Sequence, residues 1–331
     1  MPVTDAFVVG HVTVAIGSPG TKYTLLYDPG SSNTWVGADK QYVVTSSSQQ
    51  TSDTVAVTYG SGTFSGNEYT DLLTLNGVSF TQSIGVARTS TGFQDVDGIL
   101  GIGPTNLTTG TLSPDAQEEI PTVTDVLYSQ GDIDNPAVTI TNTTLTFGPA
   151  TSVDVTYASI TTSSPANTFW GVDASFAYGT QNLQSSTSGI IDHGSSLLLL
   201  ATSGYNRFLT QTGAKPDQTT GLPMLSNESC DKLDPIILTF AGVNITIPVE
   251  LYRWPGDQNS GIGGSSDQCY LAVGDIGSDF NSFQQGTGLR FRRSTVPDSS
   301  DSDLNFILGY NTLKHFTVVL DKANSRVGIS N

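Results

Sequence analysis

The sequence has 331 residues and is strongly acidic, with 30 Asp and Glu residues against 13 Lys and Arg residues and a formal net charge of −17. No Lys or Arg occurs between Thr89 and Asn206. A nucleic-acid partner needs a basic face that displaces counterions, so this charge distribution comes close to excluding nucleic-acid binding. The acidity favours either high solubility or adaptation to acid, where many carboxylates are protonated.

Composition predicts a mainly β fold of about two domains. Gly and Pro are frequent, with 35 and 15 residues, while only 13% of the residues are charged. Such a composition suits short strands joined by turns better than it suits helices. Alternating apolar and polar residues, each run closed by turn residues, predict strands at 7–16, 23–27 and 55–59.

Helix signals are few. The clearest is the stretch 121–130, which Gly131 would close as a C-cap. Short helices are also predicted near 203–210 and 310–315. No apolar run approaches the roughly 18 residues that a membrane span needs.

Localisation signals are weak. The first residues lack the basic start and apolar core of a signal peptide. Four N-x-Ser/Thr sequons support secretion only weakly, and they begin at Asn106, Asn142, Asn227 and Asn244. We expect a secreted protein whose leader is absent from this chain.

Two short patterns occur twice in the same order. Residues 25–35, LLYDPGSSNTW, resemble residues 189–200, GIIDHGSSLLLL, in placing apolar residues before Asp, one further residue, Gly, Ser and Ser. Residues 97–103, DGILGIG, resemble residues 305–311, NFILGYN. Two matches in register are much less probable by chance than one, so the sequence predicts two lobes built on one plan.

The predicted lobes are residues 1–155 and 156–331, with a boundary near 148–165. A pseudo-twofold axis between them would bring Asp28 and Asp192 face to face. Two carboxylates held that close cannot both ionise, so they share a proton over a wide pH range. The charged carboxylate can then deprotonate a bound water while the neutral one hydrogen-bonds a carbonyl oxygen. This chemistry hydrolyses an amide without a covalent intermediate.

The residues that follow each aspartate suit this role. Gly30 and Gly194 would let backbone N–H groups approach the carboxylates, and Ser31 and Ser195 could bond their outer oxygens. A single Asp-x-Gly-Ser would be read as an ordinary turn, whereas two copies placed in this way favour catalysis. A serine hydrolase is disfavoured because no Gly-x-Ser-x-Gly occurs.

Neither a cofactor nor a metal is predicted. Glycine pairs lack the setting of a nucleotide loop, and a metal site formed by Asp28, Asp192 and His193 has no further ligand behind it. The two cysteines, Cys230 and Cys269, cannot form a zinc site of the CxxC…CxxC type. They could form one disulfide, worth roughly 3–4 kcal/mol in the chain-entropy model, or remain two buried free thiols.

Several longer motifs resemble those of one enzyme family. DPGSSNTWVGA, residues 28–38, is similar to Asp-Thr-Gly-Ser-Ser-Asn-x-Trp, and DHGSS, residues 192–196, to Asp-Thr-Gly-Thr/Ser. VTYGSGTFSG, residues 57–66, looks like a flap hairpin, and residues 316–330 look like a pair of closing strands. By these motifs the chain resembles the pepsin-like aspartic proteases, most closely the polyporopepsin type of basidiomycete fungi. The resemblance implies a bilobal, mainly β fold with two pseudo-twofold related lobes and a few short helices.

The resemblance also assigns roles to residues, with Asp28 and Asp192 in the catalytic positions. Tyr59 would lie over a substrate cleft, and Trp35 stands where the family has the tryptophan that hydrogen-bonds this tyrosine. Gly60 and Ser61 would offer backbone bonds to substrate, and the tripeptides that begin at Ile99 and Ile307 would brace the two aspartate turns. The resemblance also assigns apolar residues to the walls of the cleft, which implies that the substrate has apolar residues on either side of the cut. These wall residues are Leu26, Val96, Ile99, Phe169 and Val172.

Other properties follow from the same resemblance. It implies a disulfide between Cys230 and Cys269, peptide or protein substrates and inhibition by pepstatin-like compounds. It further implies a secreted monomer that needs no cofactor.

The sequence departs from the family pattern directly after each aspartate. The family has Thr or Ser there, which bonds the opposite turn, whereas this chain has Pro29 and His193. Pro29 has neither a hydroxyl nor an N–H, and each lost hydrogen bond would cost about 0.5–1.5 kcal/mol. A cationic His193 at acid pH would lower the acidity constants of the dyad; alternatively, its ring is solvated or packed and has little effect.

Two functions therefore remain open at this point. The first is an acid endopeptidase in which Asp28 and Asp192 activate one water. The second is a catalytically impaired pepsin-like protein that still binds extended peptides, because Pro29 and His193 replace the usual residues. A purely structural two-lobed protein is the weakest interpretation and predicts no pepstatin binding.

Overall fold

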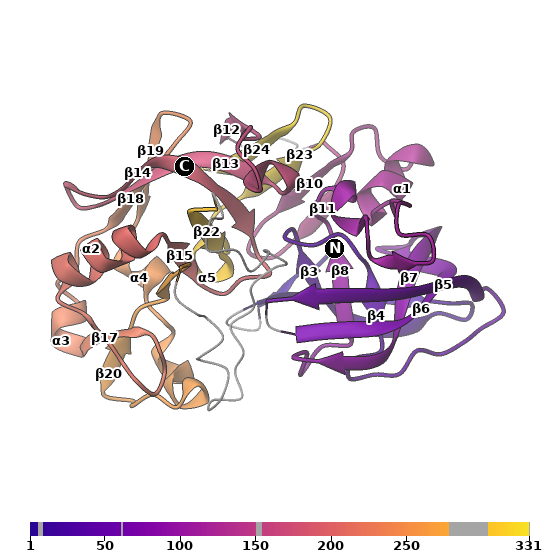
Figure 1. Cartoon of the computed structure of the whole chain (residues 1–331), viewed down its shortest axis with the longest axis horizontal. Helices are drawn as coiled ribbons and strands as arrows, with labels where there is room; N and C mark the ends of the chain where they lie inside the picture. The colour runs from indigo at the N-terminus through magenta and orange to yellow at the C-terminus, as the bar shows by residue number, and fades with distance from the viewer. Residues whose placement is uncertain (6–8, 61, 150–153, 278–303, 331) are drawn as a thin grey trace.

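The described residues form four β-sheets with a few short helices. The structure is a computed structural model and describes residues 1–5, 9–60, 62–149, 154–277 and 304–330. In Figure 1 the early strands gather on the right and the later ones on the left, with the last strands at the top between them. None of the helices in the described ranges is long and apolar enough to cross a membrane.

The first sheet has nine strands in the order β1-β2-β3-β8-β4-β7-β6-β5-β9. Strand β3 runs parallel to β8, which places Asp28 opposite Gly101. The three strands predicted from sequence are confirmed as β2, β3 and β5, although positions 7 and 8 lie outside the described residues. The strands are β1 (Thr4–Asp5), β2 (Gly10–Ile16), β3 (Thr21–Asp28), β4 (Trp35–Val36), β5 (Gln49–Tyr59), β6 (Gly62–Leu75), β7 (Val78–Thr91), β8 (Gly98–Gly101) and β9 (Leu112–Ser113).

The second sheet has seven strands and repeats the plan of the first around its own aspartate. Strand β14 runs parallel to β22, which places Asp192 opposite Gly309. Strand β15 is antiparallel to β22 and parallel to β21, just as β4 is antiparallel to β8 and parallel to β7. The strands are β13 (Gly171–Tyr178), β14 (Gln181–Asp192), β15 (Leu198–Leu200), β18 (Ile236–Phe240), β19 (Val243–Ile247), β21 (Val273–Asp275) and β22 (Phe306–Gly309).

A third sheet combines strands from both ends of the chain, in the order β11-β10-β23-β24-β12. The predicted closing strands are confirmed here as β23 and β24, and the predicted lobe boundary falls at the first residue of β12. The strands of this sheet are β10 (Ala137–Ile140), β11 (Leu145–Phe147), β12 (Val155–Ser159), β23 (Val318–Asp321) and β24 (Arg326–Ser330). A small fourth sheet contains β16 (Lys215–Pro216), β17 (Pro223–Ser226) and β20 (Gln268–Tyr270).

The helices are short, and the three predicted from sequence are confirmed. Helix α1 begins after Thr122, whose hydroxyl accepts the N–H of Asp125 while that carboxylate accepts the N–H of Thr122. Gly131, with φ of 78°, follows its C-cap in the left-handed region that favours glycine. The helices are α1 (Val123–Ser129), α2 (Thr202–Thr212), α3 (Asn227–Cys230), α4 (Val249–Tyr252) and α5 (Tyr310–Leu313), with 3-10 turns η1 (Thr105–Thr108), η2 (Ala166–Thr168) and η3 (Gly256–Ile262).

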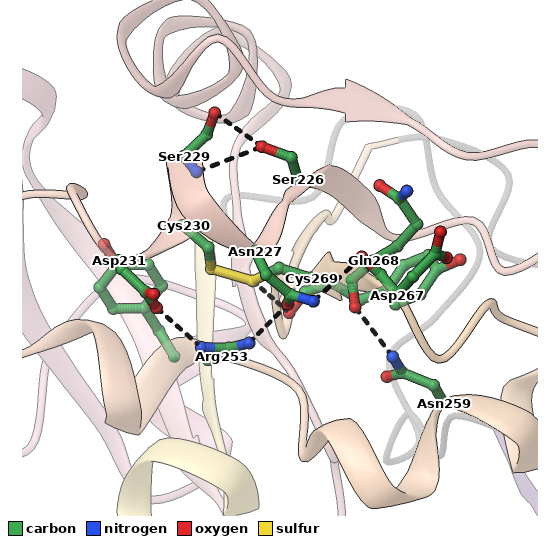
Figure 2. The surroundings of a disulfide bond; sticks show 12 residues. Ser226, Asn227, Ser229, Cys230, Asp231, Arg253, Asn259, Asp267, Gln268 and Cys269 are labelled. Carbon is green, nitrogen blue, oxygen red and sulfur yellow. Dashed lines mark hydrogen bonds and ion pairs between the residues drawn. A yellow bond between two sulfur atoms is a disulfide. The ribbon is translucent and has the colours of Figure 1, made fainter.

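A disulfide joins Cys230 to Cys269, as the resemblance implies, and so ties α3 to β20 (Figure 2). Asn227 supports the same junction, because its amide donates to the carbonyl of Asp267 at 3.0 Å while its side-chain oxygen accepts from Arg253 at 2.8 Å. The alternative of two free thiols is therefore wrong.

Candidate active site

The two aspartates occupy equivalent places, each at the end of a strand whose parallel neighbour ends in glycine. A Cβ on Gly101 would lie 2.4 Å from the backbone carbon of Ser32, and one on Gly309 would lie 2.2 Å from the carbonyl oxygen of Leu197. Only glycine lets the chain that follows each aspartate pass this closely. The repeated Ile-Leu-Gly pattern is thereby explained by the packing of the two turns.

Each carboxylate is held by the same pair of donors. The backbone N–H two residues further on donates to Oδ1, and the serine hydroxyl three residues further on donates to Oδ2. These distances are 2.9 and 2.6 Å from Gly30 and Ser31 to Asp28, and 2.8 and 2.6 Å from Gly194 and Ser195 to Asp192. Both carboxylates are thus fixed by short bonds of matching geometry.

The two side chains meet across the turns. A Cβ on Gly194 would lie 2.2 Å from Oδ1 of Asp28 and 3.1 Å from Oδ1 of Asp192, and both aspartates are buried. Burial raises the pKa of Asp28 well above its usual range, and the charge of Asp192 and a hydrogen bond with it act in the same direction. The bonds from Ser31 and Gly30 oppose this rise. The pair therefore holds one proton over a range in which two isolated carboxylates would both be charged.

His193 is a packed neutral ring, so the expectation of a cationic side chain at acid pH is wrong above about pH 3. It is 1% exposed, and neither ring nitrogen has a hydrogen-bond partner within the described part of the chain. Its ring centroid lies 5.6 Å from that of Tyr27 and 6.3 Å from that of Tyr310. Burial lowers the pKa of His193 to about 3. The alternative of a packed ring is the one that the structure bears out.

Tyr59 ends β5 at the tip of the hairpin with β6, where the resemblance places the flap. Its ring is buried edge-on against Phe93, with centroids 5.3 Å apart, and lies 6.4 Å from the ring of Trp35. The expected hydrogen bond from Trp35 to Tyr59 is not found: the indole N–H of Trp35 has no acceptor among the residues described. The ring of Trp35 instead stacks on Phe64, with centroids 4.3 Å apart. Gly60 continues the hairpin tip, and Ser61 lies outside the described residues.

The predicted apolar walls fall into separate groups. Leu26, Val96 and Ile99 belong to one buried cluster with Trp35 and Tyr59. Two further wall candidates come from the second half: Phe169 lies in a cluster with Ile190 and Leu199, and Val172 lies wholly within the main core.

Sequence reasoning missed two residues at this site. Phe93 completes the aromatic cluster around Tyr59, and Trp170 donates from its indole N–H to the carbonyl oxygen of Ile102 at 3.0 Å. Neither belongs to a repeated motif or to a periodic pattern. No cluster of three or more metal-ligating side chains occurs among the residues that the structure describes.

Comparison with known proteins gives one family. The sequence model described as "Eukaryotic aspartyl protease" matches residues 11–331. Polyporopepsin from Irpex lacteus is 42% identical over 346 residues, covering 100% of this chain and 96% of that protein. Pepsin A from Bos taurus is 25% identical over 348 residues, covering 96% of this chain and 82% of that protein. The crystal structure of aspartic proteinase from Irpex lacteus matches with a TM-score of 0.91 at 42% identity, covering 100% of this chain and 96% of that one.

Proposed function

We propose, on the premise that this chain belongs to the eukaryotic aspartyl protease family, that Asp28 and Asp192 are its catalytic pair. The chain is a pepsin-like aspartic protease, and its reaction is the hydrolysis of peptide bonds. In our proposal these two carboxylates activate one water molecule at acid pH.

One observation carries the assignment of these residues. The two aspartates receive the same pair of hydrogen bonds, at 2.6 to 2.9 Å, at the ends of two equivalent strands, although they lie far apart in the sequence. Ordinary surface turns would not bury two carboxyl groups against one another, since burial of like charges is costly. A shared proton removes that cost and supplies both an acid and a base.

The reaction follows from the proton distribution. The charged carboxylate takes a proton from water as the water oxygen attacks the peptide carbonyl carbon. The neutral carboxyl donates its proton toward the carbonyl oxygen, so the intermediate is a neutral gem-diol. Collapse of this intermediate breaks the C–N bond as the protonated carboxyl gives its proton to the leaving nitrogen and the charged carboxylate takes a proton from one hydroxyl of the gem-diol. The pair returns to one proton, and no bond to the protein forms.

The replacement of the usual threonines by Pro29 and His193 does not remove this machinery. Gly30, Ser31 and their counterparts hold the carboxylates without either residue, and burial lowers the pKa of His193 to about 3, so its ring is neutral above that pH. These observations support activity over the impaired peptide-binding alternative, which no particular contact favours.

The substrate contacts are also part of the proposal. We infer that Tyr59, Gly60 and Ser61 close over a bound peptide, with Trp35 beside the flap tyrosine. Apolar substrate residues on either side of the cut would contact apolar side chains from both halves of the protein. The side chains that we propose for these contacts are Leu26, Val96, Ile99, Phe169 and Val172. We further propose that the protein is a secreted monomer and that pepstatin-like compounds inhibit it.

The test is cleavage of a quenched fluorescent peptide with an apolar scissile pair, from about pH 2.5 to about pH 6, with and without pepstatin. Asp28→Asn and Asp192→Asn should each abolish pepstatin-sensitive cleavage, because either change removes one member of the proton-sharing pair. Asp132→Asn removes one exposed carboxylate and should leave turnover unchanged. Turnover that survives in either dyad variant, or its absence from the folded wild-type protein, would overturn the proposal.

A further inference from the structure

The geometry points to Trp170 as a positioning residue that links the two aspartate turns in place of the missing hydroxyl bonds of residues 29 and 193. This inference rests on the proposed function, because it assigns Trp170 a role in keeping Asp28 and Asp192 together. Trp170 lies just before β13 in the seven-stranded sheet and is 5% exposed. Its indole and its backbone reach toward different aspartates.

The first half of the link runs from Asp28 to Trp170 through Ile102. The N–H of Ile102 donates to the backbone carbonyl of Asp28 at 3.0 Å. The carbonyl of the same Ile102 accepts the indole N–H of Trp170 at 3.0 Å. Ile102 follows β8 of the nine-stranded sheet, so this second bond crosses from one large sheet region to the other.

The second half of the link runs from Trp170 to Asp192. The backbone carbonyl of Trp170 accepts the N–H of Ile191 at 3.1 Å, and Ile191 directly precedes Asp192. Three hydrogen bonds thus connect the backbone at Asp28 with the backbone at Asp192. Ile102 and Ile191 are each 1% exposed, so water does not compete for these bonds.

The need for such a link follows from the two replaced residues. Pro29 has no hydrogen-bond donor, and the ring of His193 makes no hydrogen bond to any described residue. The carboxyl groups of Asp28 and Asp192 also hydrogen-bond each other, but that contact joins only the tips of the two side chains. Backbone bonds such as that from Gly103 to Ser31 and that from Tyr310 to Ser195 stay within one half. His193 does contact Tyr27 of β3, but a ring contact allows sliding that a directional hydrogen bond opposes.

The alternative is that Trp170 only fills space in the core. Trp170→Phe separates the two roles, because it keeps an aromatic ring and removes the indole donor. If Trp170 positions the dyad, kcat should fall about tenfold to about a hundredfold, since small displacements of catalytic groups are costly. KM should stay within about twofold, because no substrate contact is removed.

The decisive comparison uses a second background. Pro29→Thr with His193→Thr restores the family's residues, and Trp170→Phe should then cost less than about threefold in kcat, because the link becomes redundant. If the double replacement fails to fold, Pro29→Thr alone serves as the background. Trp254→Phe is the matched control, because it also removes a buried tryptophan from the second half. Its effect on kcat should be small and the same in both backgrounds.

The pH profile gives a readout that core filling would not move. The charge of Asp192 raises the pKa of Asp28, so turns that separate should shift the alkaline limb of kcat/KM to lower pH in Trp170→Phe. An equal loss of kcat in both backgrounds, with an unmoved pH profile, would overturn the inference. If the wild-type protein proves inactive, the same variants are compared by urea unfolding. The loss of stability on Trp170→Phe should then be smaller in the restored background, and equal losses would again overturn the link.

Discussion

The two aspartate turns agree in every bond to their carboxylates and differ in the residue directly after the aspartate. The first turn has Pro29, whose ring fixes φ and offers no donor. The second has His193, a buried aromatic ring packed between Tyr27 and Tyr310. Despite this difference, Asp28 and Asp192 receive the same donors at nearly the same distances.

This comparison separates two tasks within each turn. The residues two and three positions after each aspartate orient the carboxylates. The residue directly after each aspartate contributes instead to how the two turns are held together. Changes to the first set should therefore affect catalysis directly, and changes to the second should act through the contact between the halves.

The largest effect is expected from Gly194→Ala. Its Cβ would lie 2.2 Å from Oδ1 of Asp28, so the carboxylate of the first turn must move. We expect kcat to fall by at least about a hundredfold, which progress curves with the quenched peptide would measure. Gly256→Ala is the control, because a Cβ there meets nothing within 4 Å. Near wild-type turnover in Gly194→Ala would mean that the two turns are less closely packed than described.

A smaller effect, on stability and not on chemistry, is expected from His193→Phe. The pKa of His193 is lowered to about 3 by burial, whereas an unfolded histidine has a pKa near 6.5. Between these values the unfolded chain binds a proton that the folded one does not, so the wild-type protein loses stability as pH falls. Phenylalanine keeps the ring contacts but cannot bind a proton in the unfolded state. The free energy of unfolding of the variant should therefore exceed that of the wild-type protein by about 1.4 kcal/mol more for each pH unit from pH 6.5 down to pH 3.

Urea unfolding at several pH values measures this difference, with Asp28→Asn in both proteins to prevent self-digestion. His315→Gln, at an exposed histidine, should show a much weaker dependence on pH. A gain that is constant across the pH range would show that His193 is not held as a neutral ring.

The smallest effect is expected from Ser31→Ala and Ser195→Ala, which remove equivalent donors at 2.6 Å. Each bond is charge-assisted, so each change should lower kcat about tenfold. Because the Ser31 bond lowers the pKa of Asp28, its loss should also move the alkaline limb of the pH profile upward. Steady-state assays of both variants, with Ser129→Ala as a control for loss of an exposed serine, measure both effects. Losses that differ by more than about tenfold would break the equivalence of the two turns.

The parts of this site that were predictable from sequence are those with a local reason. The glycine of each Ile-Leu-Gly tripeptide is required by the close approach of backbone, Gly194 is required by its contact with the carboxylate of Asp28, and serine supplies a hydroxyl at a fixed spacing. Such requirements recur wherever the turn recurs, and both copies were therefore recognisable. Helix α1 was predictable for a similar reason, since its cap and its terminal glycine are adjacent in the chain.

The parts that were missed depend on distant partners. Trp170 donates to a backbone carbonyl 68 residues away, and a carbonyl is the same for every residue type, so no sequence pattern marks its acceptor. The charge of His193 depends on burial by Tyr27 and Tyr310, which only the folded chain brings together. The position of Val172 in the main core, away from the other wall candidates, also depends on which face of β13 is covered.

The sheet that combines β10, β11 and β12 with β23 and β24 bears on the order of folding. Its register places Ala137 opposite Asp321, and the amino group of Met1 donates to the carbonyl of Leu145 on β11. The chain between Ala137 and Asp321 forms a long loop, and closing it costs conformational entropy. Such non-local pairings also raise the contact order, and a high contact order slows folding. Strand β10 pairs with β11, but β10 lacks its second neighbour β23, and β12 lacks its neighbour β24, until the last strands have been synthesised. Completion of the sheet is therefore a late event that couples the maturation of both halves to the last strands of the chain.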